Sequence, residues 1–200
     1  MIRILTLAGL LLSTTVCPAA IIEFDFEGAG GNGLLPGNEV GTGANATNSV
    51  ASGGEVGAGL FYDTDTMRLN LNFDFEGLGG ATGLREQAGG GIHIHGPADF
   101  NGTASIAFFL NNGSQPDVVS VIAPDERSGS ISGFVSLSTA QETTLLDDEF
   151  YVNIHSDLFG GGELRGNLVR VNAVPEPGSM FALVGIVGYA CQRRWRRRSR

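Results

Sequence analysis

The chain contains only three histidines, and their spacing suits metal binding. His93 and His95 alternate with isoleucines in Gly-Ile-His-Ile-His-Gly-Pro-Ala, and His155 ends the segment Phe-Tyr-Val-Asn-Ile-His. On a β-strand, residues two apart share a face, so His93 and His95 point to the same side. Neutral imidazole binds copper and zinc well, and His155 completes a three-nitrogen site if its strand pairs nearby. The alternative is that these histidines only hydrogen-bond to loops at the end of the sheet. The sequence leaves both interpretations open.

A second pair of chemically active side chains lies near the C-terminal end of the same region. Glu163 and Arg165 are two residues apart in a strand-like segment and therefore share a face. We expect them to form a structural ion pair, either with each other or with His155. A surface pair of this kind contributes about 0–1 kcal/mol to stability.

Other catalytic arrangements are incomplete. Consecutive positions in His155-Ser156-Asp157 point to opposite faces of a strand and cannot relay a proton. Cys17 and Cys191 lie in the terminal segments, so thiol chemistry is not expected in the region between them. The sequence therefore predicts no catalytic residues and a protein that is not an enzyme. The expected cofactor is at most a single Cu or Zn ion.

The elements that must position the histidines are short strands separated by glycine-, asparagine- and aspartate-rich turns. Alternation of apolar and polar residues predicts an all-β fold, an antiparallel β-sandwich or flattened Greek-key barrel. One helical turn is predicted at 139–146, and the polar, glycine-rich segment 34–59 is expected to be an irregular crossing or edge. The predicted strands are 21–26, 57–62, 67–75, 91–95, 104–110, 118–122, 130–137, 149–155 and 163–171.

The two ends of the chain have the composition of processing segments. Residues 1–20 carry an early arginine, an apolar stretch and then small residues, which is the order of a signal peptide cleaved after Ala19 or Ala20. Residues 174–200 contain Val-Pro-Glu-Pro-Gly-Ser, an apolar run and six arginines. The apolar run of residues 180–190 would span about 17 Å as a helix, short of the roughly 30 Å hydrocarbon core. We expect a C-terminal hydrophobic helix that leaves the domain outside the cell.

Charge excludes one class of partner. The stretch from Glu23 to Glu176 holds five arginines against 21 acidic residues, which leaves a net charge of −16 in a chain whose total is −9. A surface of this sign repels phosphate backbones, so nucleic acid is not an expected partner.

The C-terminal segment resembles the PEP-CTERM sorting signal that exosortases process. The matching parts are Pro175, Glu176 and Pro177, the apolar run of residues 180–190, and the arginine cluster of residues 193–200. The resemblance implies an exosortase-type partner and a membrane helix that is present before processing. It also implies delivery to the cell envelope, outer surface or extracellular matrix of a bacterium with an outer membrane.

The region of residues 21–173 resembles a CHRD (chordin-type) domain. The matching residues are His93-Ile94-His95-Gly96-Pro97-Ala98, Tyr151-Val152-Asn153-Ile154-His155-Ser156 and Gly162-Glu163-Leu164-Arg165-Gly166. For animal relatives this implies an extracellular binding module, and for bacterial copies no settled activity. The layout is also similar to Cu/Zn superoxide dismutase, but three histidines cannot complete two metal sites. Redox turnover is therefore not expected.

Together these features predict an exported, non-enzymatic binding or structural module of the cell envelope. Its expected partners are an envelope polysaccharide or surface protein. The alternative is a Cu/Zn-type metal-binding protein or enzyme that uses His93, His95 and His155.

Overall fold

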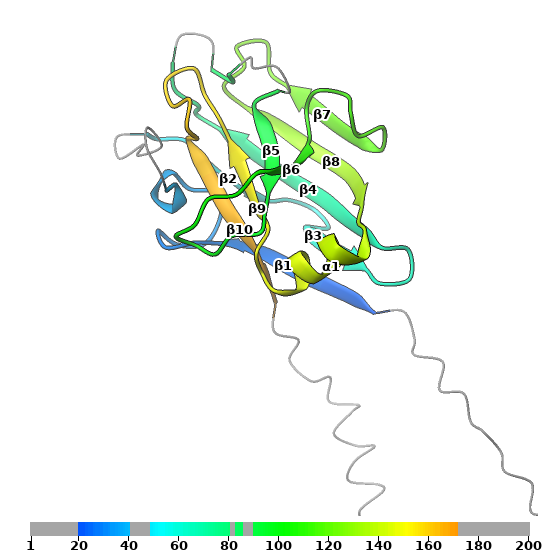
Figure 1. The fold of residues 1–200 in the computed structure, drawn as a ribbon. Helices are drawn as coiled ribbons and strands as arrows, with labels where there is room; N and C mark the ends of the chain where they lie inside the picture. Colours follow the sequence, from blue (N-terminus) through cyan, green and yellow to red (C-terminus); the bar gives the residue numbers. More distant parts are fainter. Residues whose placement is uncertain (1–19, 41–48, 81–82, 86–89, 172–200) are drawn as a thin grey trace, which may run out of the picture.

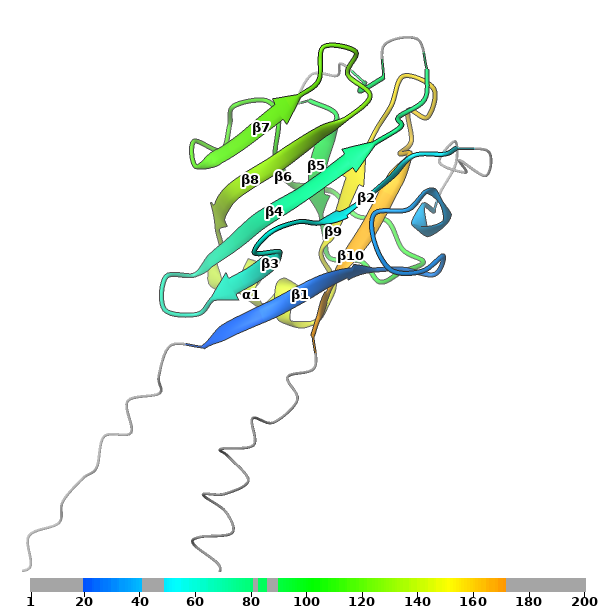
Figure 2. The ribbon, with the colours of Figure 1, turned by 180° about the vertical axis from the view of Figure 1, so that it is seen from behind.

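The computed structural model describes residues 20–40, 49–80, 83–85 and 90–171, which form one curled antiparallel sheet with one short α-helix (Figures 1 and 2). The strand order is β6-β5-β9-β10-β1-β3-β4-β8-β7, and β2 also pairs with β4. The elements are β1 (Ile21–Glu27), the 3-10 turn η1 (Pro36–Asn38), β2 (Ser52–Glu55), β3 (Leu60–Asp63), β4 (Arg68–Glu76), β5 (Ile92–His95), β6 (Ile106–Phe109), β7 (Val118–Ile122), β8 (Gly129–Ser136), α1 (Thr139–Leu146), β9 (Tyr151–Ile154) and β10 (Leu164–Arg170).

Alternating apolar side chains on the inner face of the sheet form the core. In β4 the odd-numbered residues from Leu69 to Phe75 are buried, while the even-numbered residues point outward. The sequence Phe-Asp-Phe-Glu-Gly occurs at the ends of both β1 and β4, and the ring of Phe26 packs edge-on against that of Phe73, with centroids 5.5 Å apart. The period-2 pattern therefore decides which face of each strand enters the core.

The all-β prediction is confirmed, and a strand lies at each of the nine predicted positions. The helix is confirmed at Thr139–Leu146, where Ser138 and Gln141 form a capping box. The segment 34–59 is more regular than predicted, because it contains η1 and β2. The sequence of β2, Ser-Gly-Gly-Glu, has no apolar alternation, and its pairing depends on the neighbouring β4.

The first and last strands are direct neighbours. Phe24 lies opposite Arg170, and the N–H of Val171 donates to the carbonyl of Glu23. Both ends of the described domain therefore leave the sheet side by side, at the end where α1 lies (Figure 1). The predicted signal peptide, residues 1–20, lies outside the described residues apart from residue 20. The predicted tail, residues 174–200, lies outside them entirely. Within the described ranges, no helix is long and apolar enough to span a bilayer.

Candidate metal centre

Two neighbouring strands, β5 and β9, bring the histidines together on the face of the sheet turned away from the core. In the pairing of β5 with β9, His93 lies opposite Asn153 and His95 lies opposite Tyr151. His155 follows β9, and its backbone N–H donates to the carbonyl of Gly91. Because side chains alternate along β5, Ile92 and Ile94 enter the core, and both imidazoles project from the opposite face.

The three imidazoles converge closely enough to share one metal ion. One nitrogen from each ring can be chosen so that all three lie within 4.8 Å of one another. The ring of His93 is 5.1 Å from that of His155 and 5.5 Å from that of His95, measured between centroids. All three side chains are buried, with His93 3 % exposed and His95 and His155 each 9 % exposed. The predicted grouping of His93, His95 and His155 is thus present in the structure.

Hydrogen bonds orient two of the three rings. Nδ1 of His95 lies 3.0 Å from the carbonyl oxygen of Ala104, and Nδ1 of His155 lies 3.1 Å from that of Gly160. A carbonyl oxygen only accepts, so this geometry assigns the ring proton to Nδ1 in both histidines. Nε2 of each ring then carries a free lone pair. Metal-binding histidines commonly have the second ring nitrogen held by a carbonyl in this way.

The inner ring nitrogens have no hydrogen-bond partner. Nδ1 of His93 and Nε2 of His95 and His155 are buried and unpaired among the described residues. Leaving a buried acceptor unpaired costs about 1–3 kcal/mol. Each of the three rings therefore has one buried nitrogen whose pairing with a bound cation would stabilise it.

Burial keeps the three rings neutral. Burial lowers the pKa of His93 to about 4, and the proximity of His155 and then His95 contributes in the same direction. Burial also lowers the pKa of His95 and of His155, although the hydrogen bonds to the backbone of Ala104 and Gly160 oppose it. Metal binding requires neutral imidazole, so the rings hold their ligand form at neutral pH without losing protons.

Aromatic side chains enclose the cluster. The ring of Tyr151 stacks on that of His95 at 5.0 Å and 6° between planes, and Phe109 meets His93 edge-on at 5.2 Å. On the other side of Tyr151, the Cζ atom of Arg165 lies 3.7 Å from the ring centroid. The hydroxyl of Tyr151 accepts a hydrogen bond from the backbone N–H of Ala104 at 3.2 Å. The phenol therefore fixes both the plane of His95 and the loop that holds its Nδ1.

The loop of residues 96–105 crosses this face and is held by polar side chains of β10. Arg165 donates to the carbonyl oxygens of Gly102 and Asp99, each at 2.8 Å, and also to Oδ1 of Asn167. The side-chain amide of Asn167 donates to the carbonyl of Ala98 at 3.2 Å. These contacts hold the loop against β10, and the carbonyl of Ala104 at its end faces Nδ1 of His95.

The predicted ion pair of Glu163 and Arg165 is wrong. Both side chains are buried, at 0 % and 1 % exposed, and the one salt bridge within the described ranges joins Arg170 to Asp148. The carboxylate of Glu163 accepts hydrogen bonds from the hydroxyl of Ser49 and the N–H of Gly79, away from Arg165. The guanidinium of Arg165 instead donates to the backbone carbonyls of Asp99 and Gly102 in the crossing loop, in place of the expected carboxylate of Glu163.

Two further buried side-chain oxygens lie near Arg165 and the histidines. Oε1 of Glu39 and Oδ1 of Asn153 are buried without a partner among the described residues. Burial raises the pKa of Glu39 to about 8, against the opposing effects of Arg165, the Val40 backbone and Asn153. Gly162 has φ of +129°, and an added Cβ would lie 2.6 Å from Oε2 of Glu39. A glycine is required there because Glu39 and Asn153 fill the space that a side chain would take.

Sequence reasoning missed several of these neighbours. Tyr151, Asn153 and His155 occupy alternate positions of one strand, as do Arg165 and Asn167 of the next, so a period-2 polar pattern was available. Glu39 lies in a segment without a repeating pattern, and nothing local in the sequence places it beside β9.

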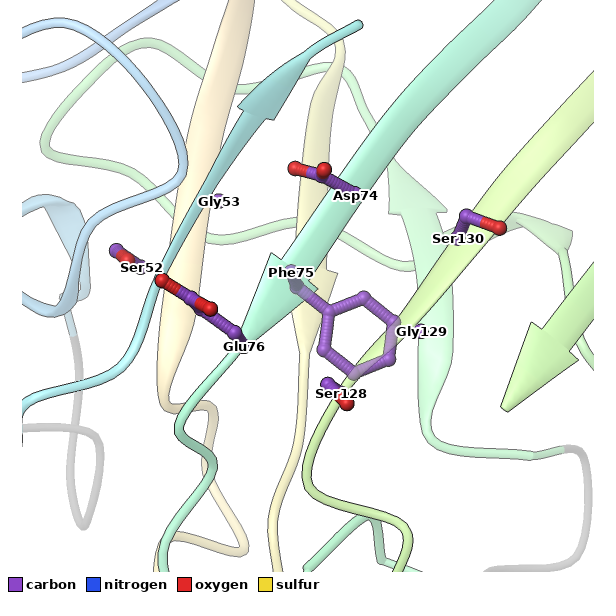
Figure 3. A pocket seen from close by; sticks show the side chains of 8 residues that line it. All are labelled: Ser52, Gly53, Asp74, Phe75, Glu76, Ser128, Gly129 and Ser130. Atoms are coloured by element: carbon purple, nitrogen blue, oxygen red, sulfur yellow. The ribbon is translucent and has the colours of Figure 1, made fainter. Parts of the chain in front are cut away.

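A separate hollow of about 560 Å³ lies on the outer surface of β2, β4 and β8 (Figure 3). Its wall is made of hydroxyl and carboxyl groups together with glycines and one phenylalanine. The lining residues are Ser52, Gly53, Asp74, Phe75, Glu76, Ser128, Gly129 and Ser130. None of their side-chain atoms is a buried polar atom without a partner, unlike the five unpaired acceptors around the histidine cluster. The unsatisfied polar groups of the described residues therefore concentrate at the histidines.

Fold and site together define a class: an all-β domain with a three-histidine cluster beneath a loop on the outer face of its sheet. Residues 37–168 match the family model of the CHRD domain. This match covers more than half of the chain, which therefore belongs to the CHRD-domain family. No curated protein and no solved structure shows significant similarity to the chain. The CHRD part of the predicted resemblance is confirmed.

Proposed function

We propose that this CHRD-domain protein is an exported binding module that holds a single Cu or Zn ion through His93, His95 and His155. The observation that carries the proposal is that one ring nitrogen of each of the three buried histidines lies within 4.8 Å of the other two. Each ring also has a buried nitrogen without a hydrogen-bond partner among the described residues. Imidazole nitrogen suits both metals, and three histidines are a known protein ligand set for zinc.

The competing interpretation, that the histidines only hydrogen-bond to loops, accounts for two of the six ring nitrogens. It explains Nδ1 of His95 and of His155, which face carbonyl oxygens. It does not explain why each ring has a buried nitrogen without a partner among the described residues, or why the three rings come so close together. A purely structural cluster would gain stability by replacing these rings with apolar side chains, because no polar atom would then be left unpaired.

The proposal is tested by measuring the metal content of the purified protein. We expect about one Cu or Zn per chain in the wild type after exposure to either metal, and loss of this metal in a His93→Ala/His95→Ala variant. Ser130→Ala/Ser132→Ala is a matched control, because it also changes two polar residues spaced by two on the outer face of a strand. Equal metal content in the wild type and the histidine variant would refute the site.

The export part of the proposal depends on the two terminal segments. Cleavage of residues 1–20 and recognition of Pro175, Glu176 and Pro177 by an exosortase-type enzyme would deliver the domain to the envelope or matrix, where a polysaccharide or surface protein is the proposed partner. The neighbouring ends of β1 and β10 support this, since both segments can be processed without crossing the domain. We expect tagged protein at the cell surface, and retention at the membrane when residues 175–177 are deleted. Full-length protein free in the cytosol would refute export.

A further inference from the structure

The three histidines leave part of the coordination sphere of a bound ion open. Among the described residues, the cluster offers three donor atoms, whereas protein-bound zinc and copper usually have four or more ligands. An ion held by His93, His95 and His155 would therefore take at least one ligand from outside this set. This inference rests on the proposed metal-binding function, and its subject is the chemical class of that ligand.

Arg85 lies directly beside the cluster. Leu84 forms an antiparallel bridge with Ser156, and the N–H of Arg85 donates to the carbonyl of His155 at 2.9 Å. This register places Arg85 opposite His155, and residues opposite each other in an antiparallel pair project to the same face. The side chain of Arg85 is thus a neighbour of the third histidine.

The guanidinium of Arg85 approaches Gly160 with its Nη1 end. A Cβ added to Gly160 would collide with Nη1 of Arg85, and the carbonyl of Gly160 is the group that accepts the ring proton of His155. The side chains of Arg85 and His155 therefore meet at the same residue, Gly160.

The accessible side of the cluster includes His155. His155 and His95 keep 9 % of their surface exposed, against 3 % for His93, and Arg85 next to His155 is half-buried. A divalent ion on neutral imidazoles and an adjacent arginine would create a local positive potential in a protein whose overall charge is −9.

We propose that the metal centre binds a small carboxylate or similar oxyanion, with one oxygen on the metal and the others on the guanidinium of Arg85. A guanidinium presents two parallel N–H donors that match the spacing of carboxylate oxygens, and such charge-assisted bonds are about twice as strong as neutral ones. The arrangement selects anions over neutral ligands of the same size, because only an anion interacts favourably with both cations.

The test uses azide as a spectroscopic probe on the purified full-length protein loaded with one equivalent of Cu²⁺. Azide affinity is measured from its charge-transfer absorption with copper, and acetate is then added as a competitor. We expect Arg85→Gln to weaken both azide and acetate by about tenfold or more, the loss of one charge-assisted hydrogen bond. Arg85→Lys, which keeps the charge but loses the paired donors, should weaken acetate by a smaller factor.

Arg68→Gln is the matched control, since it removes the same charge from an exposed position on β4. Its azide affinity should stay within about twofold of the wild type, because distant exposed charges are screened. Unchanged azide and acetate affinity in copper-loaded Arg85→Gln, or equal weakening in Arg68→Gln, would overturn the anion site and leave the metal site standing. Failure of the wild type to bind one Cu²⁺, or equal binding by His93→Ala/His95→Ala, would instead overturn the proposed function.

Discussion

Replacing Arg165 with methionine removes a buried guanidinium that fastens the loop of residues 96–105 over the histidines. The part-buried carbonyl oxygens of Asp99 and Gly102 would lose their donors, and each costs up to about 1–3 kcal/mol where no water replaces the donor. Loss of the contact with the Tyr151 ring adds about 1 kcal/mol. Relief from burying a charge offsets part of this cost. We therefore expect the free energy of unfolding to fall by about 3–5 kcal/mol, a large part of the 5–15 kcal/mol typical of a domain.

Urea unfolding followed by circular dichroism measures this change, with the midpoint and slope compared between wild type and variant. Arg68→Met is the control, because the Cζ atom of Arg68 also lies over a ring, 4.1 Å from the Phe134 centroid, but on an exposed position. It should cost less than about 1 kcal/mol. A decrease below about 1 kcal/mol for Arg165→Met would refute the reasoning, since Arg165 would then behave as a surface charge.

Three further predictions concern the metal-free protein. Acidification from about pH 6.5 toward pH 4 should lower the free energy of unfolding, because histidines of the unfolded chain bind protons in this range whereas buried His93 stays neutral down to its pKa of about 4. Urea midpoints measured across pH should fall less steeply for His93→Gln, and an equally steep fall would contradict the prediction. Glu39, whose pKa is raised to about 8, should have the opposite effect: its contribution to the free energy of unfolding is complete below pH 4.5 and is lost as the pH rises toward 8. Glu39→Gln should remove this loss of stability at rising pH, and an unchanged slope of stability against pH in the variant would disprove the prediction. Gly162→Ala should lower stability by about 1–3 kcal/mol, because its φ of +129° and the nearby Glu39 and Asn153 leave no room for a Cβ; Gly54→Ala, with no atom within 4 Å, is the control, and equal melting temperatures would refute the steric argument.

Most of the strands could be predicted because they alternate apolar and polar residues over a single buried face. The strand Arg68–Glu76 is the clearest case, with Leu69, Leu71, Phe73 and Phe75 all in the core. Ser52–Glu55 has no such pattern, so its place in the sheet is decided by pairing with β4 and cannot be read locally.

The histidine cluster was predictable in composition but not in its surroundings. The Ile-His-Ile-His pattern places His93 and His95 on one face, and β9 brings His155 to them. The burial of Arg165 was not predictable, because it depends on a loop whose carbonyls arrive from about 65 residues earlier in the chain. Glu163 was assigned the wrong partner for the same reason, since Ser49 and Gly79 come from distant segments.

The position of β10 also determines how the domain would respond to tension. β10 is bonded to β1 on one side and to β9 on the other, so a pull applied at Val171 is resisted by two ladders at once rather than peeling off an edge. The same strand carries Arg165 and Asn167, which fasten the loop above the histidines. A module tethered through its C-terminal side would therefore transmit mechanical load into the strand that holds the loop next to the proposed metal site.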